Sequence, residues 1–168
     1  MITALLLLSI SIGTNFEGGS LGKIERAAPA HFRCAVKGES DQDGRNRQAN
    51  WYYFRVDGAT GAKVVVDLVN LPGEYNYRPN RGAVTKDTIP VYSEDRLSWR
   101  HFDRTALEYD EREPSLRLKF QPRGPHFWIA HVPPYTNAGL EALFPTQRTQ
   151  PYENSSRVRQ RTDCRHRL

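Results

Sequence analysis

Apolar and polar residues alternate along much of this chain, with the two-residue period of a β-strand that buries one face. The clearest case is 115–120, where three apolar side chains alternate with Arg117 and Lys119. The segment 64–69 is almost wholly apolar, which predicts a more central strand. In 51–56 the bulky residues fall on both faces, so both are expected to be partly covered. Further strands are predicted at 10–15, 31–36 and 127–132.

Turn signals separate these runs at short intervals, for example Asp57-Gly58 and Pro72-Gly73. Short strands with this punctuation are typical of a β-sandwich or an open barrel. One helix is predicted after Thr136 and Asn137, whose side chains can cap its first amides. Pro145 ends it. The pattern therefore predicts an all-β, antiparallel β-sandwich-like domain with one short C-terminal helix.

The chain of 168 residues has room for one domain, predicted at 10–143. Residues 1–9 are apolar, too short to span a bilayer, and lack a basic flank, because the first Lys or Arg is Lys23. They are either a signal-like segment or part of the first strand. We expect a cytoplasmic protein without a membrane segment; the alternative is export, if residues 1–13 act as a signal peptide.

The positive charge is concentrated at the C-terminus. Residues 147–168 contain six arginines with Glu153 and Asp163, a net +4, which leaves only +1 of the total +5 for the rest of the chain. Residues 144–168 also lack an apolar period, so a disordered basic tail is expected. Nucleic-acid binding is expected only as a property of this tail, and is the less favoured interpretation.

No catalytic or metal-binding constellation is present in the sequence. None of the five histidines begins an H-x-x-E motif, and the two cysteines do not form a metal knuckle. Cys34 lies in an alternating run and is expected to be a buried small apolar residue. Ser93 and His101 have no nucleophile elbow around them. We therefore predict neither catalytic residues nor a metal site.

Three segments carry a resemblance to a known family. They are NWYYFRV at 50–56, EYNYRPNRG at 74–82 and WIAHVPPYT at 128–136. Together they resemble the N-terminal β-domain of cytosolic-type zinc carboxypeptidases, a branch of the carboxypeptidase A clan. The resemblance covers residues 10–143.

The resemblance implies an accessory domain of a metallocarboxypeptidase, an enzyme that removes C-terminal residues from peptides. Zinc is expected only in the catalytic domain, which this sequence does not include, so the chain itself should be inactive and without a cofactor. The implied partner is that catalytic domain, normally in cis, and peptide substrates follow from the family alone. A stop within a longer gene is one hypothesis for the tail, and natural divergence is the other.

The segment around 74–82 is the strongest candidate for recognition, because its aromatic and arginine side chains are typical of interfaces. The alternative is that its tyrosines cap the core and that Asn80, Arg81 and Gly82 form a tight turn. The predicted domain-interface residues are Tyr75, Tyr77, Arg78, Asn80, Arg81, Tyr92 and Tyr135. A stand-alone module that binds peptide or carbohydrate through this loop is the second interpretation.

Overall fold

The computed structural model describes residues 9–40 and 47–143. The predicted segments 1–9 (apart from residue 9) and 144–168 therefore lie outside the described residues. The chain divides into two units, 1–134 and 135–168. The first contains all the strands of the described residues, and the second contains α1 (Asn137–Leu143). Thr136 caps this helix as predicted, because its Oγ1 accepts from the Gly139 amide at 3.1 Å.

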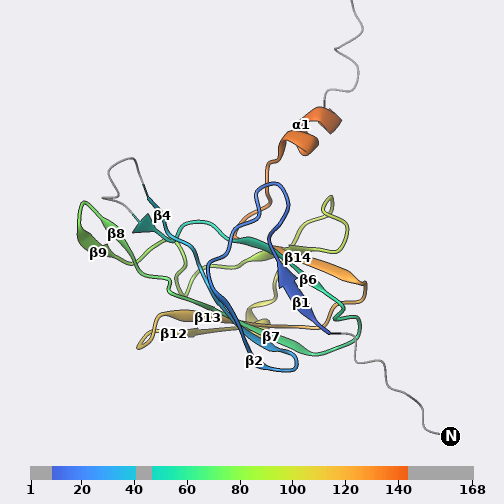
Figure 1. Cartoon of the computed structure of the whole chain (residues 1–168), viewed down its shortest axis with the longest axis horizontal. Helices are drawn as coiled ribbons and strands as arrows, with labels where there is room; N and C mark the ends of the chain where they lie inside the picture. The colour runs from blue at the N-terminus through green and yellow to red at the C-terminus, as the bar shows by residue number, and fades with distance from the viewer. Residues whose placement is uncertain (1–8, 41–46, 144–168) are drawn as a thin grey trace, which may run out of the picture. The chain divides into compact units, whose positions relative to one another are not determined.

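The first unit is built from two five-stranded sheets and a smaller four-stranded sheet (Figure 1). The first sheet has the order β1 (Ser11–Gly13), β6 (Tyr53–Asp57), β14 (His126–Ala130), β10 (Val91–Ser93), β11 (Arg100–His101). The second has the order β12 (Leu107–Asp110), β13 (Ser115–Phe120), β7 (Val64–Val69), β3 (His31–Ala35), β2 (Ile24–Ala28). The third has the order β4 (Glu39–Ser40), β5 (Arg47–Gln48), β8 (Gly73–Tyr75), β9 (Arg78–Asn80).

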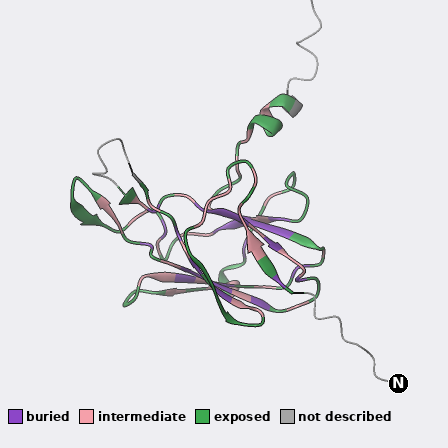
Figure 2. Ribbon diagram, in the orientation of Figure 1, coloured by how far each residue is buried: buried purple, intermediate pink, exposed green. Residues whose placement is uncertain are grey.

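The hydrophobic core lies between the two large sheets. Alternate residues of β6 and β14 in the first sheet, such as Phe54 and Ile129, belong to the same buried cluster as Val66 and Leu118 of the second. Cys34 joins this cluster with no exposed surface, and its burial raises the pKa of the thiol to about 12. The predicted β-sandwich-like fold and the buried role of Cys34 are thus confirmed (Figure 2).

One strand pair departs from the antiparallel prediction. β3 and β7 run parallel, with His31 opposite Val65 and Cys34 opposite Leu68. All other pairs in the three sheets are antiparallel. Strand direction depends on the connections between strands, which the alternation of side chains does not reveal.

The outer face of the first sheet is closed by a second apolar cluster. It is built on Tyr53, Val91, Trp128 and Ala130. Two loops supply the cover, residues 14–20 and 94–99, as aromatic contacts place rings of both loops against Tyr53. The dual character predicted for 51–56 is explained by this arrangement, because alternate residues of that segment serve the two clusters.

Candidate functional site

Five of the seven predicted interface residues lie in the β8–β9 hairpin or directly after it. It lies in the small sheet, at one end of the sandwich (Figure 1). Tyr75 and Tyr77 are 53% and 70% exposed, so neither caps the core. Arg47 Nε and Nη2 both donate to Glu74 Oε2, at 3.1 and 2.7 Å, and this ion pair fixes the hairpin to β5.

The turn of this hairpin has an unusual residue in it. Tyr75 pairs with Arg78, so the loop has two residues, Asn76 and Tyr77, and both have positive φ, 49° and 59°. Two positive φ angles define a type I′ turn, whose second position favours glycine. A bulky aromatic residue in the left-handed region costs about 1–2 kcal/mol. Tyr77 is therefore held, exposed, in a conformation that stability alone would not select.

Below the turn, Asn80 and Arg81 line a groove of about 530 Å³. Three prolines and Tyr109 form its apolar surface: Pro72 directly before β8, Pro79 in β9, and Pro114 and Tyr109 in the β12–β13 hairpin. Asn80 acts within the chain, because its Oδ1 accepts from the Gly82 amide at 2.8 Å. Gly82 has φ of 73°, so the predicted tight turn is present together with the exposed tyrosines.

The charges around the groove are partly matched. Lys86 pairs with Glu111 at 3.5 Å across it. The guanidinium groups of Arg78 and Arg81 make no hydrogen bond or ion pair with the residues that the structure describes. Tyr75, Tyr77, Arg78 and Arg81 thus offer aromatic surface and uncommitted donors on one hairpin.

Tyr92, one of the two remaining predicted residues, does not join this surface. Tyr92 lies on β10 of the first sheet and stacks on Phe127, with ring centroids 5.1 Å apart. Tyr135 is 74% exposed and belongs to the second unit. The seven residues predicted from the sequence therefore do not form one continuous site within the first unit.

A second polar arrangement was not anticipated from the sequence. On the outer face of the second sheet, five charged residues from five adjacent strands lie opposite one another and alternate in sign: Glu25, Arg33, Asp67, Arg117 and Glu108. Each of the three central residues stands between two apolar ones in sequence, as in Val66-Asp67-Leu68. That local pattern signals an outward charge, but only the register shows that the charges meet.

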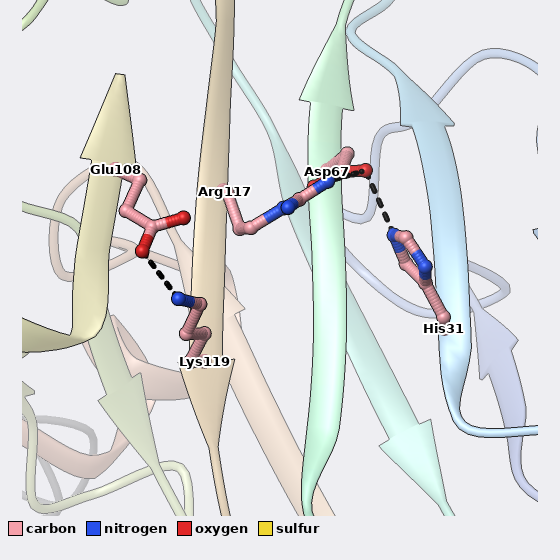
Figure 3. Close-up of polar contacts among 5 residues, drawn as sticks. All are labelled: His31, Asp67, Glu108, Arg117 and Lys119. Atoms are coloured by element: carbon pink, nitrogen blue, oxygen red, sulfur yellow. Dashed lines mark hydrogen bonds and ion pairs between the residues drawn. The ribbon is translucent and has the colours of Figure 1, made fainter. Parts of the chain in front are cut away.

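Asp67 is the centre of this row (Figure 3). It is only 4% exposed, and its carboxylate accepts from Arg117 Nε at 2.7 Å and Nη2 at 3.1 Å and from His31 Nε2 at 2.8 Å. Burial alone raises the pKa of Asp67, but the hydrogen bonds from Arg117 and His31 outweigh it and lower the pKa below its usual value. Lys119 and Glu108 form a further exposed pair beside it.

This network supports structure rather than catalysis. A carboxylate with a lowered pKa that accepts three hydrogen bonds is a poor general base. Ser93 Oγ donates to Asp95 at 2.8 Å and accepts from two backbone amides, which commits it to a turn. His31 and His126 contact different carboxylates, Asp67 and Asp57, and so do not share one site.

Within 9–40 and 47–143, no group of three or more His, Cys, Asp or Glu side chains converges in a way that could hold a metal ion. In the same ranges, no helix is long and apolar enough to cross a membrane.

The fold is that of part of known metallo-carboxypeptidases. A metallo-carboxypeptidase from Burkholderia cenocepacia matches with a TM-score of 0.64 and 22% identity, over 85% of this chain and 34% of the other. A putative carboxypeptidase from Burkholderia mallei matches with a TM-score of 0.62 and 25% identity, over 86% and 34%. A metallo-carboxypeptidase from Pseudomonas aeruginosa, solved with (2-guanidinoethylmercapto)succinic acid, matches with 0.60 and 21%, over 79% and 32%.

The family model described as the cytosolic carboxypeptidase N-terminal domain matches residues 12–131, and the chain belongs to this family. The resemblance found in the sequence is thereby confirmed. The chain spans about a third of the length of the solved structures that it matches. A search of curated proteins found no match.

Proposed function

We propose that this chain is the non-catalytic front domain of a zinc metallocarboxypeptidase, and that it acts by packing against the peptidase domain. Membership of the N-terminal domain family supports this proposal, as does the match to only 34% of the length of a solved relative. The absence of a metal-binding group among the described residues is consistent with a zinc site elsewhere. The family's description as cytosolic supports a cytoplasmic location.

The conformation of Tyr77 is the observation that carries the assignment of the contact surface. A 70% exposed aromatic side chain gains little in the isolated domain, and its positive φ is unfavourable. Strained residues persist where they serve a contact or a site. Tyr75 and Tyr77 would insert into the partner, while Arg78 and Arg81 would bind acidic side chains around them.

The groove beside the hairpin would receive an apolar projection of the same partner. Its prolines are rigid, so little conformational entropy is lost when a surface packs on them. Asn80 positions the groove through its bond to Gly82 and is not expected to touch the partner directly. Tyr135, which follows the sandwich in the chain, remains a predicted contact residue.

A direct assay tests the non-catalytic part of the proposal. The full chain, purified and supplied with zinc, should release no C-terminal residue from unstructured peptides. Turnover that co-purifies with the folded chain, and that a chelator abolishes, would contradict the assignment.

A chimera tests the contact surface. Residues 10–143 would replace the matching third of the Burkholderia cenocepacia metallo-carboxypeptidase, and the thermal midpoint and peptidase activity of the chimera would be measured. Tyr77→Gly should stabilise the isolated chain by about 1 kcal/mol, since it relieves the left-handed tyrosine. In the chimera the same change should lower the midpoint or the activity.

Leu97→Ser is the matched control, because Leu97 is 85% exposed on the 94–99 loop, away from the hairpin. It should leave the chimera unchanged. If Tyr75→Ser and Tyr77→Gly together behave like this control, the hairpin is not the contact surface.

A further inference from the structure

A cleft separate from the hairpin opens at the edge of the sandwich, between the two large sheets. It has a volume of about 490 Å³ and is lined by β10, β11 and the ends of β13 and β14. Tyr92 and Phe120 line it, whereas the groove beside the hairpin lies at the opposite end of β13, near Pro114. Its volume is within the range of small-molecule sites.

The floor of the cleft is a column of stacked aromatic rings. Tyr92 and Phe127 are 5.1 Å apart with an interplanar angle of 16°, and Phe127 and Phe120 are 4.9 Å apart with an angle of 7°. The column therefore joins the first sheet to the second. Phe127 is 3% exposed, which fixes the centre, while Tyr92 and Phe120 are half-buried and border the cleft. The ring edges of this column form a rigid apolar floor, which loses little entropy when a ligand packs on it.

The acceptors on the rim are held in place by backbone amides. Asp95 accepts from the amides of Leu97 at 2.8 Å and Ser98 at 2.7 Å. These bonds lower the pKa of Asp95, which therefore stays ionised. Glu94 accepts from the Arg123 amide at 2.8 Å. Both carboxylates line the cleft as preorganised acceptors.

The donors on the rim are two arginines. Arg100 is directly opposite Tyr92 in the sheet, so its side chain lies on the same face. Arg123 stands on the loop after β13. Neither guanidinium has a hydrogen bond or ion pair with any residue in the described ranges. With Asp103 also on the rim, the cleft has two positive and three negative groups, so it does not select for a charged ligand.

We propose that this cleft binds a neutral saccharide. The C–H face of a sugar ring would pack against the edges of these stacked rings, at Tyr92 and Phe120. Its hydroxyl groups would donate to Asp95 and accept from Arg100 and Arg123, which matches the mixed rim because a hydroxyl is both donor and acceptor. This binding function is additional to the contact with a peptidase domain and uses a different part of the first unit.

Titration of the full chain with trisaccharides tests the proposal. The probes are cellotriose, maltotriose, xylotriose and chitotriose, each added to about 10 mM, which detects dissociation constants into the millimolar range. Amide shifts in ¹H–¹⁵N spectra are the measurement. At least one trisaccharide should shift amides of 92–103 and 120–127 in a saturable manner, while those of 73–82 stay unchanged.

Variants of the rim distinguish this cleft from any other surface. Arg100→Ala and Arg123→Ala change exposed side chains, so both should fold, and each should weaken binding about tenfold or more. Arg104→Ala is the matched control, since Arg104 lies on the adjacent turn at 104–106 and does not line the cleft. It should bind as the unmodified chain does.

Three results would overturn the proposal. One is that no trisaccharide shifts the cleft amides at the highest concentration. Another is that binding persists unchanged in both arginine variants. The third is that benzoate or phosphate binds in the cleft while the sugars do not. None of these bears on the chimera, which reports on the hairpin, so this proposal and the proposed function can fail separately.

Discussion

The two large sheets close their outer faces by different means. The first sheet carries Trp128 and Tyr53, which two loops cover with further aromatic rings. Trp51 Nε1 also donates to the Gly18 carbonyl at 2.8 Å, which ties one loop down. The second sheet has no such cover among the described residues and instead arranges charges of alternating sign around Asp67. One face therefore depends on apolar burial, and the other on hydrogen bonds and ion pairs.

The difference predicts how each face responds to its surroundings. The stabilisation from apolar burial changes little with salt or pH. Exposed ion pairs are instead weakened by salt, and a carboxylate loses its charge and its ion pair when it is protonated. The covered aromatic face should contribute more to the free energy of unfolding than the charged face. Large aromatic rings bury much apolar area, whereas exposed ion pairs contribute little free energy.

The largest expected effect is on the aromatic face. Tyr53→Ala removes a ring that is 1% exposed and that contacts Phe16, Trp51 and Trp99. It should lower the free energy of unfolding by about 3–5 kcal/mol. Urea denaturation measures this. Tyr53→Phe is the control and should retain most of the stability; equal losses in both variants would show that the ring packing is not the cause.

The next effect is on the charged face. Asp67→Asn removes the charge that Arg117 and His31 share, and should cost about 1–3 kcal/mol at neutral pH. The same denaturation experiment applies. Asp67 is the buried group of the row, so its loss should have the largest effect. A variant as stable as the unmodified chain would therefore mean that the row of charges does not stabilise the sheet.

Acid should separate the two faces further. A lowered pKa means that Asp67 contributes its stabilisation above the ordinary aspartate pKa of about 3.9, and that this is lost as pH falls through the folded value. Asp67→Asn should therefore reduce the loss of stability below about pH 4. The urea midpoint against pH measures this. A residual acid loss is expected from Asp95, whose pKa is also lowered.

Another loss should appear at a higher pH. Burial lowers the pKa of His131, so the unfolded state binds a proton before the folded state does as pH falls below about 6.5, and the free energy of unfolding decreases.

An Asp67→Asn variant whose urea midpoint falls below pH 4 as that of the unmodified chain does would contradict the stabilising role given to the Asp67 carboxylate.

The smallest effect is expected at the exposed end of the row. Glu108→Gln breaks the pair with Lys119, whose side chains are 55% and 47% exposed. The loss should be at most about 0.5 kcal/mol and should vanish in high salt. A larger loss that persists in salt would mean that the row behaves as one cooperative unit.

The sequence predicted those strands whose buried face alternates clearly. β7 and β13 begin and end at the predicted residues, and α1 begins at Asn137, one residue before the predicted start. β2 was missed because its five residues are all exposed and it has no apolar face to give an alternation. β8 and β9 were missed because three residues are too short for a periodic pattern.

Candidate sites could be predicted only where neighbours in sequence act together. The hairpin residues Tyr75 to Arg81 are contiguous, so their composition was enough to single them out. The positive φ of Tyr77 was not visible, because local composition does not give a backbone angle. The row around Asp67 and the cleft at Tyr92 each join strands that are far apart in the chain, and only the strand register brings them together.

Hydrogen exchange on the chimera is the most direct test of the central claim that this domain packs on a peptidase domain through its hairpin. Amide exchange would be compared between the full chain alone and the same domain in the chimera. We predict slower exchange at 73–88 in the chimera and no change along β2, on the opposite edge of the second sheet from β12. Unchanged exchange at 73–88 in a folded, active chimera would contradict the account.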